Sequence, residues 1–134
     1  MASVGVVLDA LKAIGEETRL RIVALLGRAE LTVTDLTEIL GQSQPRVSRH
    51  LKLLVDAGIV AKHREGTWVF FRLVDDGPTA ALLAGVLDPF DDSDPILRSD
   101  APPPEAEIRA LLRDLHRWLG PRGFHWLEIG RAHV

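Results

Sequence analysis

The sequence contains no cysteine among its 134 residues, which excludes disulfide frameworks, zinc ribbons and any metal site built on thiolates. It also lacks a long hydrophobic run. The apolar segment near the N-terminus is interrupted by Asp9 and Lys12, far short of the roughly 18 to 20 apolar residues that a spanning helix needs. No basic segment precedes an apolar stretch with a small-residue cleavage site, which argues against secretion. We therefore expect a cytoplasmic protein.

The composition is that of a globular protein, with 46% hydrophobic and 26% charged residues, and the length predicts one domain with at most an appendage. The net charge of -3 hides an internal asymmetry. Residues 42–72 carry six basic and two acidic side chains, whereas residues 75–107 carry one basic and nine acidic. Salt screens electrostatic forces beyond about 8 to 10 Å, so phosphates respond to the local charge of a segment and not to the net charge of the protein. The basic segment is therefore compatible with nucleic-acid binding. The alternative is a solvated surface of uneven charge.

Apolar residues at spacings of three and four, together with capping residues and glycines, predict four consecutive helices. Ser43 and Pro45 fit the start of the fourth helix, and only a short turn at residues 41–42 separates it from the third. The third helix has Thr32 or Thr34 as its cap. The first predicted helix covers residues 4–14 and the fourth covers residues 44–57. The second starts at Glu16 and Glu17 and is closed by Gly27 and Arg28, and the third runs from its threonine cap through Leu40.

The fourth helix has a dry side and a cationic side when its residues are placed at about 100° per residue. The dry side carries Val47, Leu51, Leu54 and Val55. The other side carries Arg46, Arg49 and His50, with Lys52 on the flank.

Two segments rich in β-branched and aromatic residues, 59–65 and 67–73, meet at Gly66 and predict a hairpin. The predicted fold is therefore mainly α with a β-hairpin wing, a winged helix-turn-helix. A further helix is expected over residues 75–87, an acidic proline-rich linker kept extended over 88–104, and a last helix over 105–119. We expect a DNA-binding and dimerisation domain at 1–87 and a C-terminal helix and tail at 105–134.

A helix can read the major groove only if its exposed side carries donors for base edges and phosphates. Such donors occur on the fourth helix, and Lys62 and Arg64 share one face of the predicted wing, where they would follow the DNA backbone. The candidate DNA-binding residues are Ser43, Gln44, Arg46, Ser48, Arg49, His50, Lys52, Lys62, His63 and Arg64. The alternative is that these bases only keep an amphipathic helix soluble.

Residues 11–73 resemble the ArsR family of winged-helix repressors, named for arsenical-resistance regulators. The most specific segments are TRLRIVALL (18–26), SQPRVSRHLKLLVDAGIV (43–60) and KHREGTWVFFRL (62–73). The resemblance implies a DNA-binding transcriptional repressor that binds an operator as a homodimer through its first and fifth helices. The dimer residues expected here are Val4, Val7, Leu8, Leu11, Ala80, Leu83, Ala84 and Leu87.

The sequence departs from the metal-sensing members of that family. Thr32 and Thr34 stand where those members have cysteines, and hydroxyls are poor ligands for soft metals. Other members of the family hold zinc on their C-terminal helices through an Asp-x-His pair and a distant His-x-x-His or His-x-x-Glu pair. Asp114-x-His116 and His125-x-x-Glu128 resemble this pattern, but the two pairs are close together in the sequence and Pro121 interrupts the helix. Surface histidines are the preferred interpretation, so we expect no metal and no cofactor.

The tail, GPRGFHWLEIG at residues 120–130, resembles the approach to the first strand of a class I methyltransferase. An alternative function is therefore the regulatory N-terminal fragment of a regulator fused to an S-adenosylmethionine-dependent methyltransferase. Arg131 and the residues after it replace the glycine loop that would hold the cofactor, so as it stands the chain is not expected to be an enzyme. A common sequencing adapter also encodes residues 128–134, which favours an artefact there. A third alternative is a winged helix that binds only protein.

Overall fold

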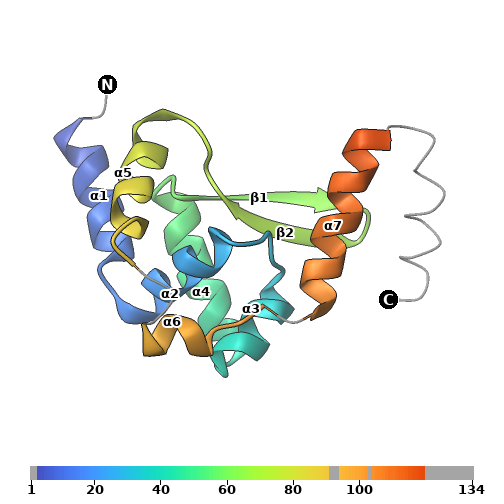
Figure 1. Cartoon of the computed structure of the whole chain (residues 1–134). Helices are drawn as coiled ribbons and strands as arrows, with labels where there is room; N and C mark the ends of the chain where they lie inside the picture. The colour runs from blue at the N-terminus through green and yellow to red at the C-terminus, as the bar shows by residue number, and fades with distance from the viewer. Residues whose placement is uncertain (1–2, 91–93, 103, 120–134) are drawn as a thin grey trace. The chain divides into compact units, whose positions relative to one another are not determined.

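The computed structural model describes residues 3–90, 94–102 and 104–119 (Figure 1). The chain divides into two compact units, Met1–Pro102 and Pro103–Val134, and each is considered by itself. Within the described residues, the second unit consists of one amphipathic helix, α7 (Pro104–Leu119), and the first holds all the other elements. None of the described helices combines the length and hydropathy needed to cross a membrane.

Four helices open the first unit, close to the predicted positions: α1 (Val4–Ile14), α2 (Glu17–Leu26), α3 (Val33–Leu40) and α4 (Gln44–Asp56). Thr32 is the cap of α3: its hydroxyl accepts from the backbone N–H of Asp35, whose carboxylate accepts from the N–H of Thr32. Gly41 ends α3 in the left-handed region, with φ of 65°, which allows the chain to turn at once into α4.

The strands β1 (Val60–Glu65) and β2 (Trp68–Leu73) form the predicted antiparallel hairpin, with Lys62 opposite Phe71 and Glu65 opposite Trp68. Leu31, just before α3, pairs with Phe71 and ties the hairpin to the helices. The helices and this hairpin confirm the predicted winged helix-turn-helix.

The core of the first unit lies where α2, α3 and α4 meet the start of the hairpin. Side chains from these elements are at most 1% exposed because each helix turns its apolar face inward. They are Ile22, Val23, Leu25, Leu36, Val47, Leu51, Leu54 and Ile59.

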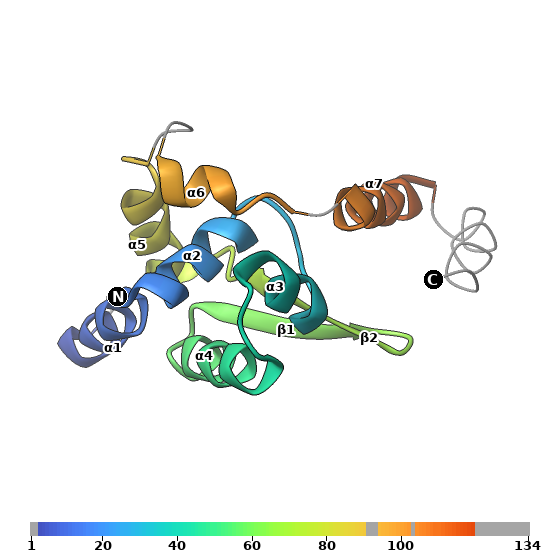
Figure 2. The same ribbon diagram turned by 90° about the horizontal axis from the view of Figure 1, so that it is seen from below.

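The helix α5 (Gly77–Leu87) begins two residues later than the predicted Asp75, with Asp76 as its N-cap residue. The views of Figures 1 and 2 agree that α1 and α5 lie at one end of the first unit while the hairpin turn points to the other. The two helices expected to form a dimer are therefore at the same end of the first unit.

The expectation of an extended linker over residues 88–104 is wrong for residues 95–99, which form a short helix, α6 (Pro95–Ser99). Asp94 caps it by accepting the N–H groups of Ile96 and Leu97, and a proline in the first turn of a helix costs no hydrogen bond. The buried Asp100, 2% exposed, then receives two hydrogen bonds of 2.7 Å from the Arg21 guanidinium of α2. This bidentate pair attaches the segment to α2.

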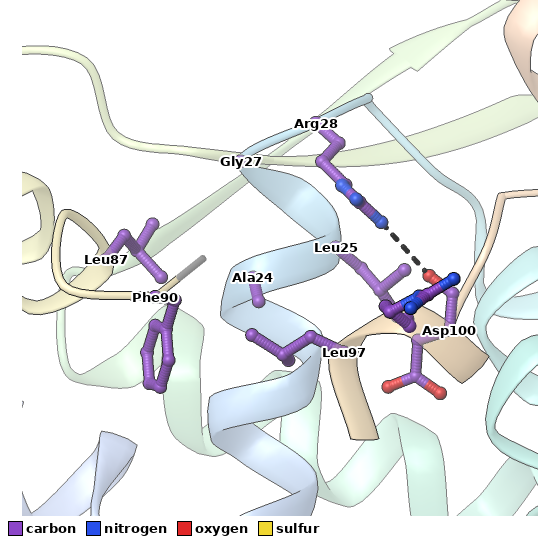
Figure 3. Close-up of a pocket in the computed structure, with 9 residues that line it drawn as sticks. Ala24, Leu25, Gly27, Arg28, Leu87, Phe90, Leu97 and Asp100 are labelled. Atoms are coloured by element: carbon purple, nitrogen blue, oxygen red, sulfur yellow. Dashed lines mark hydrogen bonds between the residues drawn. The ribbon is translucent and has the colours of Figure 1, made fainter. Parts of the chain in front are cut away.

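A cavity of about 200 Å³ lies where α6 meets α2 and the end of α5 (Figure 3). Its walls are both apolar and polar, and Arg28 donates to the backbone carbonyl of Asp100 at its edge. The lining includes Ala24, Leu25, Leu87, Phe90 and Leu97. It contains none of the candidate DNA-binding residues.

We predict that Asp100→Ala lowers the free energy of unfolding by about 2 to 3 kcal/mol, because the Arg21 guanidinium, 19% exposed, loses its carboxylate. Urea unfolding measures this change. Asp88→Ala is the matched control: Asp88 is exposed, and its loss should change stability by less than about 0.5 kcal/mol. Equal effects of the two substitutions would show that residues 94–100 are not held on α2.

Candidate nucleic-acid interface

The helix α4 presents its cationic side to solvent because its apolar side packs into the core. Val47, Leu51 and Leu54 are buried, and α4 lies along the lower edge of the first unit in Figure 2. Six of the seven candidate residues at its start and along it are exposed: Ser43, Gln44, Arg46, Ser48, Arg49 and Lys52. Their common orientation is the one that the 3.6-residue period predicts.

On the hairpin, strand alternation separates the three basic residues of β1. Lys62 and Arg64 are exposed on one face, as predicted. The side chain of His63 is 31% exposed, and its Nε2 lies 3.6 Å from Glu30 Oε2 and 3.8 Å from Glu65 Oε1. The nearest charged neighbours of His63 are therefore carboxylates, and its contact with DNA stays a prediction.

Two hollows bring the candidate residues together. One, between α4 and the hairpin, is lined by Ser48 and Lys52 from the helix and by Lys62 from the strand. The other lies at the start of α4 and is lined by Ser43, Pro45, Arg46, Arg49 and His50. The helix α4 and the hairpin, although separate in the sequence, thus line one hollow together, with Asp56 and apolar side chains beside the two lysines.

Most cations of this surface have no ion-pair partner among the described residues. Lys52 is the exception, with Nζ 2.9 Å from Asp56 Oδ2. The other four cations, which pair with no carboxylate in the described part of the chain, are Arg46, Arg49, Lys62 and Arg64. An exposed group of unpaired cations attracts anions and costs little desolvation when it meets them.

His50 does not project from α4 as predicted. Its side chain is 13% exposed, and Nδ1 lies 3.2 Å from Arg19 Nη1 and 3.9 Å from Glu16 Oε2. Burial lowers the pKa of His50; the Glu16 carboxylate opposes this, and the charges of Arg19, Arg46 and Arg49 add to it. Glu16 and Arg19 are thus part of the site, and both were missed by the sequence analysis.

The candidate dimer residues fall into three groups. Val4, Leu8 and Leu11 of α1 are exposed, at 77%, 47% and 43%, and Ala84 of α5 is also exposed. Val7, Ala80 and Leu87 are half-buried. Leu83 is 2% exposed because it packs into the core of its own chain, so its assignment to the dimer face is corrected.

Within the described residues, no group of three or more side chains is arranged to hold a metal ion. Thr32 is occupied as the cap of α3. The second imitated metal site falls largely outside the described residues, since His125 and Glu128 lie in the stretch 120–134.

Comparison with known proteins places this geometry in a family. Residues 16–62, from the start of α2 into β1, match the family described as bacterial regulatory protein, arsR family. A homodimeric winged helix-turn-helix DNA-binding domain from Mycobacterium bovis, described as a possible ArsR-family transcriptional regulator, is 30% identical, with a TM-score of 0.56 over 61% of this chain and 75% of that one. The chain belongs to the ArsR family.

The similarity to two curated relatives covers about two thirds of the length of each relative. The arsenic resistance transcriptional regulator ArsR1 of Pseudomonas putida is 44% identical over 58% of this chain and 62% of its own length. The transcriptional repressor SdpR of Bacillus subtilis is 36% identical over 46% of this chain and 69% of its own. Both relatives are described as transcriptional regulators and give no support to the methyltransferase alternative.

We predict that protonation of His50 destabilises the fold. Because its folded-state pKa is lowered from the ordinary value of 6.5, the neutral ring contributes stability above that pH, which is lost as the pH falls through the folded-state pKa. Urea unfolding from about pH 7.5 to 5.5 should show a smaller loss of stability in His50→Gln than in the wild type. Parallel curves, or a His50 ring that titrates above 6.5, would contradict this.

Proposed function

We propose that this chain is a DNA-binding transcriptional regulator that represses by occupying an operator as a homodimer. The helix α4 enters the major groove, and the hairpin contacts the DNA backbone. The proposal extends to a cytoplasmic location, where such a protein meets the chromosome.

The observation that carries the proposal is the shared surface of α4 and the hairpin. Lys62 lines the same hollow as Ser48 and Lys52, so cations from two separate elements face the same space. Arg46 and Arg49 continue this surface toward the start of α4. A helix with donors on its outer side and a basic strand beside it matches the width and charge of a DNA groove.

The two parts of the surface have different tasks. Arg46, Arg49 and Gln44 stand on the helix, where side chains can reach base edges, and arginine binds guanine through two hydrogen bonds. Lys62 and Arg64 stand on the wing and neutralise phosphates, which adds affinity without reading sequence. Ser43 adds a hydroxyl that makes no capping bond to its own helix.

The exposed apolar residues of α1 support a second copy of this chain as the partner. Val4, Val6, Leu8 and Leu11 are all more than 40% exposed, and burying such side chains is the main driving force of association. The solved Mycobacterium bovis relative is a homodimer. We propose a dimer face made by α1 and α5, with Val4, Val7, Leu8, Leu11, Ala80, Ala84 and Leu87.

Arg49→Ala is expected to weaken operator binding by about 1 to 3 kcal/mol while leaving binding to random DNA nearly unchanged, because a base contact is lost. Lys62→Ala should instead weaken both and reduce the salt dependence by about one unit. Fluorescence anisotropy with the DNA upstream of the gene measures both effects.

Arg98→Ala is the control with the same loss of charge, since Arg98 is exposed on α6, outside the proposed surface. It should bind like the wild type. If the wild type binds its upstream DNA no better than random DNA, the proposal is wrong.

Leu8→Glu is expected to convert the dimer to a monomer in sedimentation velocity, because a charge would be buried at the centre of the apolar face. Ile96→Glu provides a close control, since Ile96 is 45% exposed on α6 and Leu8 is 47% exposed on α1. A Leu8→Glu protein that remains dimeric would rule out α1 as the dimer helix.

A further inference from the structure

Arg19 lies at a junction of three helices. It stands in the first turns of α2, and its Nε donates to the carbonyl of Ala13 near the end of α1. Its Nη1 lies 3.2 Å from His50 Nδ1 on α4 and 3.9 Å from Glu16 Oε2. One side chain therefore joins the proposed dimer helix, α2 and the proposed recognition helix.

The contact with Arg19 determines how the ring of His50 is protonated. A guanidinium has only donors and stays charged, so a ring nitrogen in hydrogen-bond contact with it must accept. Nδ1 is therefore unprotonated, and the neutral imidazole carries its proton on Nε2.

The other edge of His50 remains available. No described residue makes a hydrogen bond to Nε2, and this atom is not among the buried polar atoms without a partner. The His50 side chain lines the hollow that also contains Ser43, Arg46 and Arg49. A donor next to two arginines and a hydroxyl is suited to an oxygen or nitrogen acceptor of DNA.

We propose that Arg19 is a positioning residue for DNA recognition: it holds His50 as the Nε2–H form, oriented so that Nε2 donates to DNA. The inference rests on the proposed function, because the acceptor is an atom of the bound duplex. It adds a residue outside the recognition helix to the determinants of binding. The charged groups that face His50 are Glu16 and Arg19 from α2 and Arg46 and Arg49 from its own helix.

The first test uses the free wild-type protein and needs no DNA. Long-range proton–nitrogen NMR spectra distinguish the two neutral forms of a histidine, and His50→Ala identifies the His50 signals among the five histidines. We expect an unprotonated Nδ1 and a protonated Nε2 in the wild type, and a mixture of forms with a raised His50 pKa in Arg19→Met. A wild-type Nδ1–H form would overturn the inference whether or not the protein binds DNA.

The second test is a double-mutant cycle on DNA affinity. Arg19→Met and His50→Ala are each expected to raise Kd about tenfold, the effect of one hydrogen bond, and the double variant should be no weaker than His50→Ala. His50→Gln keeps a donor near the position of Nε2, so it should bind better than His50→Ala and respond little to Arg19→Met. Circular dichroism checks that each variant is folded.

The outcomes separate this inference from the proposed function. If the wild type binds its operator but the effects of Arg19→Met and His50→Ala on Kd multiply, the double variant loses about a hundredfold in affinity. That result would reject the role of Arg19 and leave the proposed regulator function intact. A loss confined to the operator assigns the acceptor to a base, whereas an equal loss on random DNA assigns it to a phosphate. If Arg19→Met does not fold, the wild-type NMR result still decides.

Discussion

The inner face of α4 orients everything that we assign to DNA. Val47, Leu51 and Leu54 are buried against α2, α3 and the start of the hairpin, so the helix cannot rotate without exposing them to water. The same burial directs Arg46 and Arg49 outward, because they lie on the opposite side of a 3.6-residue period. It also holds β1 next to α4, which brings Lys62 to the hollow that contains Ser48 and Lys52. A hydrophobic constraint thus produces a cationic surface.

A second, polar set of contacts connects that helix to the rest of the unit. Arg19 links the end of α1 to His50, and Arg21, two residues later on α2, holds Asp100 through two hydrogen bonds. These two arginines point to different elements because residues two positions apart lie about 200° apart around the helix axis. The helix α2 therefore contacts both the proposed dimer helix α1 and the proposed recognition helix α4 through Arg19.

The sequence was sufficient for features that depend on local rules. Helix periods, the glycine at position 41, a cap at Thr32 or Thr34 and the strand alternation predicted the fold and the exposure of Arg46, Arg49, Lys62 and Arg64. It failed where distant residues interact. The helix period places His50 on the cationic side of α4, but its ring is in contact with Arg19, 31 residues earlier in the sequence. Asp100 stands in a segment with the composition of a linker, yet Arg21, 79 residues away in the sequence, brings it into the first unit. No periodicity encodes such pairs.

The central claim is that α4 and the hairpin together form the DNA-binding surface. Its most direct test is an NMR titration of the nitrogen-15-labelled protein with the duplex from upstream of its gene. The account predicts saturable shifts concentrated in residues 43–52 and 62–66, with α6 unaffected. Shifts concentrated on α5 and α6, or no saturable shift with any duplex, would contradict it.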